Sequence, residues 1–150
     1  MKKEKNKFTF CKVNHDSPEY WAIVELRDRV LRKPLGLEFM REELMDENEQ
    51  FHFGYFLHND LVGCLVFKNI GNSELKMRQV AINPYFQKQG IGSKMVIESE
   101  NWAIKNGFTK ISLHAREVAK SFYIKMNYQV IGSSFLEVGI SHFKLFKLLS

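Results

Sequence analysis

The residues best placed to do chemistry in this sequence form a short glycine-containing stretch, Gln87–Ser93. Apolar and polar residues alternate over Leu75–Ile82 before it, and helical periodicity runs from Ile91 to about Lys105 after it. Glycines permit a tight turn, and the first turn of a helix has backbone N–H groups without intrahelical acceptors. These donors, the helix dipole and the ammonium group of Lys88 would attract an anion. The stretch therefore predicts a pyrophosphate-binding site.

The glycine spacing separates the known kinds of phosphate-binding loop. A dinucleotide fingerprint needs a small residue three places after the second glycine, where this chain has Met95. A mononucleotide P-loop needs Gly-x-x-x-x-Gly-Lys-Ser/Thr, which the stretch does not provide. The spacing Gln87-x-x-Gly90-x-Gly92 instead resembles the coenzyme A pyrophosphate loop, Gln/Arg-x-x-Gly-x-Gly/Ala, of the GNAT N-acetyltransferase superfamily. A glycine-containing turn with no ligand is the alternative. The resemblance implies cofactor contacts from Gln87, Lys88, Gln89, Gly90, Ile91, Gly92 and Ser93.

The strand before this loop changes phase. Leu75 and Met77 are alternate apolar positions, but the apolar positions then resume at Val80 and Ile82, one residue out of phase. An extra residue near Arg78-Gln79 would produce a β-bulge, which frees backbone groups. An edge irregularity with no role is the alternative. In GNAT proteins the bulged fourth strand holds the pantetheine arm and the thioester carbonyl, so the resemblance implies this role for the backbone of Val80, Ala81 and Ile82.

A second motif supports the same resemblance. Arg116-x-x-Ala119-x-x-Phe122-Tyr123 resembles the GNAT motif Asn-x-x-Ala-x-x-x-Tyr, whose tyrosine protonates the departing coenzyme sulfur. The resemblance implies that Tyr123 is the general acid and that Arg116, Ala119 and Tyr123 contact the cofactor. Arg116 replaces the asparagine of the family motif, although a guanidinium could still bind a phosphate or a carbonyl. Asn127-Tyr128 replaces the Gly-Phe that follows in the family. A buried aromatic residue is the alternative for Tyr123.

An attacking amine also needs a general base, and two candidates lie at the start of the last predicted strand. Phe135-x-Glu137-x-Gly139-Ile140-x-His142 resembles a run in some small bacterial GNAT subfamilies. Histidine is the side chain that ordinarily changes charge near neutral pH, so His142 could accept the proton, and Glu137 could orient it or replace it. Surface polar groups without a catalytic role are the alternative. His114 is a weaker candidate, and no chemical role is predicted for His15, His52 and His58.

The predicted elements follow the order β-α-α-β-β-β-α-β-α-β-β, which is the order of the GNAT fold. The predicted strands are Phe8–Val13, Gln50–Leu57, Leu61–Lys68, Leu75–Ile82, Lys110–Ala115, Tyr128–Ile131 and Ser141–Leu149. The predicted helices are Pro18–Leu31, Glu38–Asp46, Ile91–Lys105 and Arg116–Met126. A parallel βαβ unit is expected around Ile91–Lys105. The expected fold is one α/β (α+β) acyl-CoA N-acyltransferase domain over residues 1–150, with a mixed, mostly antiparallel twisted sheet flanked by helices.

The composition of the chain limits the classes of protein to which it can belong. The 150 residues are 45% hydrophobic and 26% charged, as in a soluble globular domain. No apolar run approaches the roughly 20 residues that span a bilayer, and residues 1–7 lead into no signal-type segment, so a cytoplasmic protein with no membrane partner is expected. Cys11 and Cys64 are predicted to be reduced and buried, and no Cys/His cluster has metal-binding spacing, so no metal is expected.

These motifs predict an N-acetyltransferase that moves the acetyl group of acetyl-CoA, its cosubstrate, to a primary amine of a small molecule, peptide or protein by direct attack. One alternative is a basic nucleic-acid-binding module, which the net charge of +5 would favour. The lysines are spread along the chain, however, and no strand interleaves basic and aromatic residues as an RNA-recognition sheet does, so no nucleic-acid partner is expected. The other alternative is a non-catalytic acyl-CoA-binding protein of the same fold. The exposed edges of the C-terminal strands could pair with those of a second copy and form a homodimer.

Overall fold

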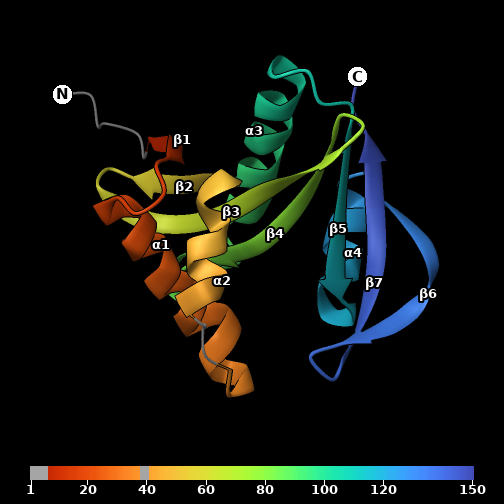
Figure 1. The fold of residues 1–150 in the computed structure, drawn as a ribbon, viewed down its shortest axis with the longest axis horizontal. Coiled ribbons are helices and arrows are strands. Elements are labelled where there is room, and N and C mark those ends of the chain that lie inside the picture. The colour runs from red at the N-terminus through yellow and green to blue at the C-terminus, as the bar shows by residue number, and fades with distance from the viewer. Residues whose placement is uncertain (1–6, 38–40) are drawn as a thin grey trace. The chain divides into compact units, whose positions relative to one another are not determined.

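The computed structural model describes residues 7–37 and 41–150, and their elements follow the predicted order. The predicted start of the second helix at Glu38 and the residues 1–6 lie outside the described residues. The strands are β1 (Phe8–Val13), β2 (Phe51–Leu57), β3 (Asp60–Gly71), β4 (Glu74–Ile82), β5 (Lys110–Arg116), β6 (Gln129–Glu137) and β7 (Ile140–Leu148). Figure 1 shows them with the α-helices α1 (Pro18–Arg27), α2 (Arg41–Met45), α3 (Ile91–Lys105) and α4 (Glu117–Lys125). Within the described residues, none of these helices combines the length and the apolar character that a membrane crossing requires.

The strands form one seven-stranded sheet in the order β1-β2-β3-β4-β5-β7-β6. Strands β4 and β5 pair in parallel, as the βαβ prediction requires, while β1–β2, β2–β3, β5–β7 and β7–β6 pair antiparallel. The predicted fold class, a mixed and mostly antiparallel sheet flanked by helices, is confirmed. The chain divides into two compact units, one comprising the residues up to Phe67 with Gln79–Glu98, and the other comprising Lys68–Arg78 with Ser99–Ser150. The prediction of a single domain over residues 1–150 stays a prediction.

In the first unit, helices cover both faces of the strands. Cys64 and Ala81 pack in a buried cluster with Tyr20, Ile23 and Leu26 of α1. On the opposite face, a Cβ atom built on Gly63 would lie next to the side chains of Ile82 and Met95, and Met95 belongs to α3. Adjacent strand residues point to opposite faces, so α1 and α3 lie on opposite sides of β3.

Helix α1 begins as the sequence predicts but ends differently. Ser17 caps it by accepting a hydrogen bond from the Tyr20 N–H group, and Pro18 occupies the first turn. Regular α-helix stops at Arg27, earlier than the predicted Leu31, and the chain continues through a π-helical turn (Asp28–Arg32) and a 3-10 turn (Lys33–Leu35). Pro34 has no N–H group to donate, so the α-helical hydrogen-bond pattern cannot continue past it. Gly36, with a φ of 69°, ends the run.

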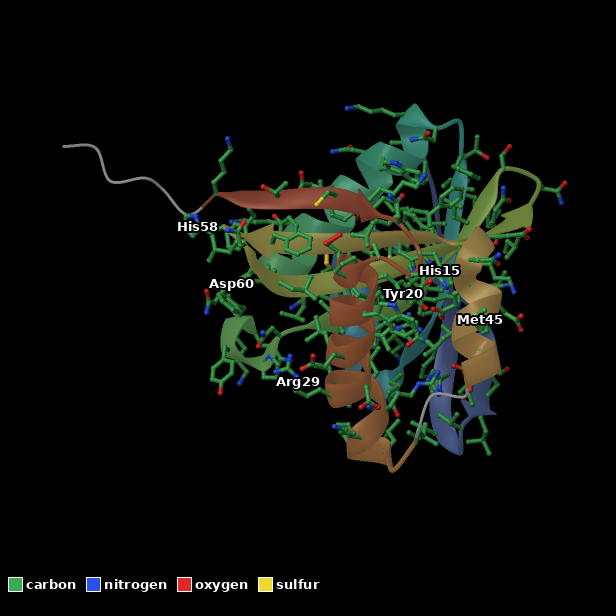
Figure 2. The ribbon with its side chains drawn as sticks, turned by 60° about the vertical axis from the view of Figure 1, so that its left-hand side comes forward. His15, Tyr20, Arg29, Met45, His58 and Asp60 are labelled. Atoms are coloured by element: carbon green, nitrogen blue, oxygen red, sulfur yellow. The ribbon has the colours of Figure 1, made fainter. Side chains whose placement is uncertain are left out.

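A buried polar cluster joins α1 to the segment before β2. The Arg27 guanidinium, fully buried, donates to both carboxylate oxygens of Glu47 at 2.8 and 2.7 Å. The Tyr20 hydroxyl donates to the same carboxylate at 2.9 Å, and the His52 ring bonds the Glu47 carbonyl at 2.8 Å. Figure 2 shows Tyr20 beside His15, whose rings lie 4.5 Å apart. Burial opposes the charge on Glu47, but Arg27 holds the pKa of that carboxyl below its ordinary value.

In the second unit, α4 packs on one face of β5 and β7. The ammonium group of Lys120 lies 4.2 Å from the centre of the Phe143 ring, and Leu145 is fully buried at the next alternate position of β7. Helix α3 ends at the predicted Asn106-Gly107. Gly107 has a φ of 85° and its N–H group bonds the Ile104 carbonyl, while the next N–H group bonds the carbonyl of residue 103, which is a Schellman motif.

The C-terminal hairpin is longer than the sequence predicts. The segment Gly132–Gly139 was expected to connect two strands, but β6 continues through it to Glu137. Phe135 pairs with His142 and Glu137 with Ile140, with a register irregularity between Ile131 and Phe135. The side chains of β6 are exposed except for that of Phe135, which is half-buried, so no apolar alternation marks this strand in the sequence.

The two cysteines are only partly as predicted. Both are free thiols, and Cys64 is buried, but Cys11 is half-buried on β1. Burial raises the pKa of the Cys64 thiol to about 12, so this thiol is not a nucleophile near neutral pH. Cys64 instead donates to the Gln79 carbonyl at 3.7 Å.

Glu47→Gln should lower the free energy of unfolding by about 3 to 5 kcal/mol near neutral pH, because it leaves the Arg27 charge buried without its partner. The pKa of Glu47 is lowered by folding, so this stability is present above the ordinary carboxyl pKa and is lost as the pH falls through the folded value. The difference between wild type and variant should therefore shrink in acid. Urea denaturation at several pH values, followed by circular dichroism, measures it.

Glu43→Gln is the matched control, since Glu43 faces Arg32 at 3.4 Å with an exposed carboxylate. This change should cost no more than about 0.5 kcal/mol. Equal losses for the two variants would contradict the role given to Glu47.

Candidate active site

The glycine loop follows β4 through a short, well-bonded turn. The Asn83 N–H group donates to the Val62 carbonyl at 2.8 Å, and the Asn83 side chain accepts from the Tyr85 N–H group at 3.1 Å. These bonds fix the end of β4 and a 3-10 turn, Pro84–Phe86, before the loop. The Gln87 side chain then donates to the Ile82 carbonyl at 3.1 Å. Gln87 therefore ties the loop back to the strand that precedes it.

The loop turns at Gly90, directly before α3. Gly90 has a φ of 74°, and its carbonyl accepts the first helical hydrogen bond, from the Lys94 N–H group at 3.3 Å. A Cβ atom built on Gly90 would meet no heavy atom within 4 Å, so the space beside the turn is open to a ligand. The N–H groups of Ile91, Gly92 and Ser93 lie in the first turn of α3, where no intrahelical acceptor exists.

One detail of the loop differs from the sequence prediction. Gly92 lies within α3, where the predicted helix places it, and its φ is not positive. The second left-handed residue is Lys88, with a φ of 63°. A positive φ is uncommon for a residue with a side chain. Lys88 and Gln89 are both exposed, as a phosphate-binding role requires.

Strand β4 is interrupted where the phase slip predicts. Gln79 has a φ of 55°, outside the β region, directly before Val80. Val80 and Ile82 are half-buried, and Ala81 between them is buried. Helices cover both faces of the strand here, so residues on either face can be hydrophobic and apolar and polar residues do not alternate.

In the second unit, Tyr123 lies on the buried side of α4. Its ring makes edge contacts with the rings of Phe122, at 5.0 Å, and Tyr128, at 5.6 Å. The Tyr128 hydroxyl donates to Glu100 at 2.9 Å, whereas the described part of the chain gives the Tyr123 hydroxyl no hydrogen-bond partner. Burial raises the pKa of Tyr123 well above its ordinary value. The hydroxyl therefore keeps its proton, which is the state that a general acid needs.

The other two residues of the tyrosine motif begin α4. Arg116, expected within the helix, is instead its N-cap residue, with an extended backbone and no capping bond from its side chain. Its side chain is exposed, and Ala119 is half-buried in the first turn. The predicted contacts of Arg116 and Ala119 with a cofactor stay predictions.

Glu137 and His142 come together with His114, which sequence reasoning ranked lower. Glu137 Oε1 accepts from His114 Nδ1 at 3.0 Å, and Glu137 Oε2 lies 3.5 Å from His142 Nε2. The His142 Nδ1–H group donates to the Ile140 carbonyl at 2.8 Å. The ring of Phe135 lies against both imidazoles, at centroid distances of 4.9 Å and 6.2 Å.

The pairing of His114 with Glu137 decides which nitrogen can act as a base. A carboxylate only accepts, so His114 Nδ1 carries the hydrogen and the neutral ring has its lone pair on Nε2. Partial burial alone would raise the pKa of Glu137, but the hydrogen bond from His114 and the charges of both histidines hold it below its ordinary value. A carboxylate with a lowered pKa is a weaker base, which suits Glu137 to orienting His114.

The acid and the base candidates lie on opposite faces of the second unit's sheet. Tyr123 belongs to α4, which packs against Phe143 and Leu145 of β7. His142 alternates with Phe143 along the same strand, so it points to the face opposite α4. Arg116 pairs with His142 across the sheet, so His114, two residues before Arg116, shares this face.

A separate groove of about 590 Å³ lies in the first unit. Its lining comprises Trp21, Val24, Glu25, Asp28, Lys33, Gly36 and Leu37. Lys33 pairs with Asp28 at 3.5 Å, and Glu25 is the other charged residue of the lining. None of the residues that the sequence motifs single out belongs to this lining.

Comparison with known proteins decides the family. The model of the acetyltransferase (GNAT) family matches residues 15–128. The chain belongs to this family. It is 27% identical over 128 residues to the protein YyaT of Bacillus subtilis, covering 80% of this chain and 86% of the relative. The N-acetyltransferase YitI of the same organism is 24% identical over 132 residues, covering 83% of this chain and 89% of the relative.

Solved structures of the same fold have low sequence identity to this GNAT protein. An acyl-CoA N-acyltransferase from Pseudomonas aeruginosa has a TM-score of 0.80 at 16% identity, covering 94% of this chain and 99% of the other. Escherichia coli ElaA has a TM-score of 0.80 at 13% identity, covering 94% and 99%. At such identities these likenesses support the GNAT fold and leave the acceptor open.

Proposed function

We propose that this GNAT protein transfers the acetyl group of acetyl-CoA to a primary amine by direct attack. The observation that carries the proposal is the left-handed turn at Gly90, with open space beside it, directly before the N-terminus of α3. Backbone N–H groups and the helix dipole at such a turn favour an anion. The family match supports coenzyme A as the source of that anion.

The first unit would hold the cosubstrate. The N–H groups of Ile91, Gly92 and Ser93 donate to the diphosphate, and the exposed Lys88 adds positive charge. The interruption at Gln79 frees backbone groups of Val80–Ile82 for the pantetheine arm. Gln87 positions the loop through its bond to the Ile82 carbonyl. Gln89, Arg116 and Ala119 remain proposed contacts.

When bound, acetyl-CoA supplies an activated thioester carbonyl. His114 Nε2 accepts a proton from the amine as its nitrogen forms a bond to the carbonyl carbon. The bond from that carbon to sulfur breaks, and the Tyr123 hydroxyl gives its proton to the sulfur. Glu137 holds His114 Nδ1 at 3.0 Å throughout and so fixes the orientation of the ring.

Among the base candidates, geometry favours His114 over Glu137 and His142. In the neutral His142 ring, Nδ1 carries the hydrogen. The other nitrogen, Nε2, lies 3.5 Å from a Glu137 oxygen. The His142 side chain is also more buried than that of His114, with 8% against 26% of it exposed. Glu137 serves as the shared orienting carboxylate.

Gly90→Asp should abolish acetyl-CoA binding in a calorimetric titration, because a carboxylate enters the space that the diphosphate needs. Gly71→Asp is the matched control, since Gly71 also has a left-handed backbone, with a φ of 92°, and open space around it. The control should bind acetyl-CoA as the wild type does. No binding by the wild type, or equal binding by Gly90→Asp, would sink the proposal.

Tyr123→Phe should lower kcat roughly 100-fold while changing the KM for acetyl-CoA little, because the phenyl ring keeps the packing but cannot donate a proton. Tyr128→Phe is the control, since its hydroxyl bonds Glu100 and has no proposed catalytic role. It should lower stability but not kcat. Unchanged kcat in Tyr123→Phe would remove that residue from the mechanism, and a thiol-release assay measures both variants.

His114→Gln should lower kcat/KM roughly 100-fold. It should also remove the part of the fall in kcat/KM at low pH, the acidic limb of the pH profile, that protonation of the base causes. Any acidic limb that remains should follow the ionisation of the acceptor amine. His142→Gln should retain the wild-type limb, because His142 only flanks Glu137. If His142→Gln loses the limb and His114→Gln keeps it, the base is His142.

A further inference from the structure

The face of β5 and β7 opposite α4 carries the candidate base among cations. Register pairs Lys76 with Ser112 and His114 with Lys144, and alternate residues of a strand share a face. Lys76, His114, His142 and Lys144 therefore lie on one face of the second unit's sheet. His142 is buried, Lys76 and His114 are half-buried, and Lys144 is exposed. We call these four residues the cationic face.

Positive charge exceeds negative charge here. Burial first, and then repulsion from Arg78, Lys68 and Lys144, lowers the pKa of Lys76, while Glu137 opposes the shift. That carboxylate already accepts a hydrogen bond from His114 and faces His142. In the described part of the chain, the Lys76 ammonium forms no ion pair within 4 Å.

An anion would relieve this imbalance. A half-buried ammonium has lost part of its hydration, and a carboxylate placed beside it forms a charge-assisted hydrogen bond. A second cation would add to the repulsion instead. The face thus discriminates by the sign of the charge that an acceptor brings.

The spacing limits how far that anion lies from the reacting amine. His114 and Lys144 are direct partners across β5 and β7, where the Cβ atoms of paired residues are about 5 Å apart. One small acceptor can therefore contact both residues, with one of its groups beside Lys144 and another beside His114. A small amino acid fits this arrangement.

We propose that the acceptor is a small amino acid with a free carboxylate, which Lys76 and Lys144 bind while its amine faces His114. The proposal rests on the proposed function and names its acceptor class. Polyamines and the lysine side chains of basic peptides would be rejected by like charge.

Kinetics with matched acceptors test the class. A panel of amino acids and their amides is assayed with acetyl-CoA over a range of pH, so that rates compare at equal concentrations of free amine. The acids should react at least about tenfold faster in kcat/KM than their amides. Faster reaction of a polyamine or of the amides would overturn the proposal and leave the acetyltransferase activity standing.

The variant Lys76→Met/Lys144→Met tests the residues. It should raise the KM for the amino acid about tenfold and leave the KM for acetyl-CoA and for the amide unchanged. Lys105→Met/Lys125→Met, which removes two exposed lysines from α3 and α4, is the charge-matched control and should change neither. A rise in the KM for acetyl-CoA alone would assign the cationic face to the cosubstrate and overturn the proposal.

A binding measurement decides the proposal without turnover. N-acetylglycine, a minimal product, should bind the wild type more tightly than N-acetylglycinamide in calorimetry, and the Lys76→Met/Lys144→Met variant should lose that preference. Equal binding of the two probes, or a preference that survives in the variant, would overturn the proposal. Failure of acetyl-CoA to bind would reject the proposed function separately.

Discussion

The register of β7 between β5 and β6 is the constraint on which the second unit's site depends. It sets His142 opposite Arg116 on one side and opposite Phe135 on the other, so the three strands place Glu137 between two imidazoles. A slip by one residue would turn every side chain of β7 to the other face. His142 would then point toward α4, and Phe143 would replace it among the polar groups. Main-chain pairing therefore determines the chemistry as much as the side chains do.

Each of the two units has its own part in the acyl transfer that we propose. The first supplies backbone donors at a helix N-terminus, which need only the correct turn at Gly90. The second supplies two side chains whose protons are fixed by their surroundings. Tyr123 is buried and keeps its proton, and the His114 ring is held by Glu137. In the proposed function, backbone groups bind the cosubstrate, which is constant, and side chains on the face opposite α4 meet the acceptor, which varies.

Most of the fold could be predicted from local signals in the sequence. Ser17-Pro18, Asn106-Gly107 and the glycine loop each act within a few residues, and the structure has them where expected. Long-range effects were not readable. The burial of Arg27 depends on Glu47, twenty residues away, and the bond of Glu137 to His114 depends on the register of three strands. The phase slip in β4 did predict the interruption at Gln79, because it is a local signal of the strand itself.

The irregularity in β6 also bears on how this protein behaves at high concentration. β6 is the last strand of the sheet, and Val130, Ile131, Leu136 and Val138 leave apolar surface exposed in and beside it. A long flat edge of this kind would recruit strands from other molecules. The register shift divides it into two short ladders, Gln129–Ile131 and Phe135–Glu137, with the kink at Gly132 between them. Because each ladder is short, this edge offers a poorer template for pairing with another chain than an uninterrupted strand would.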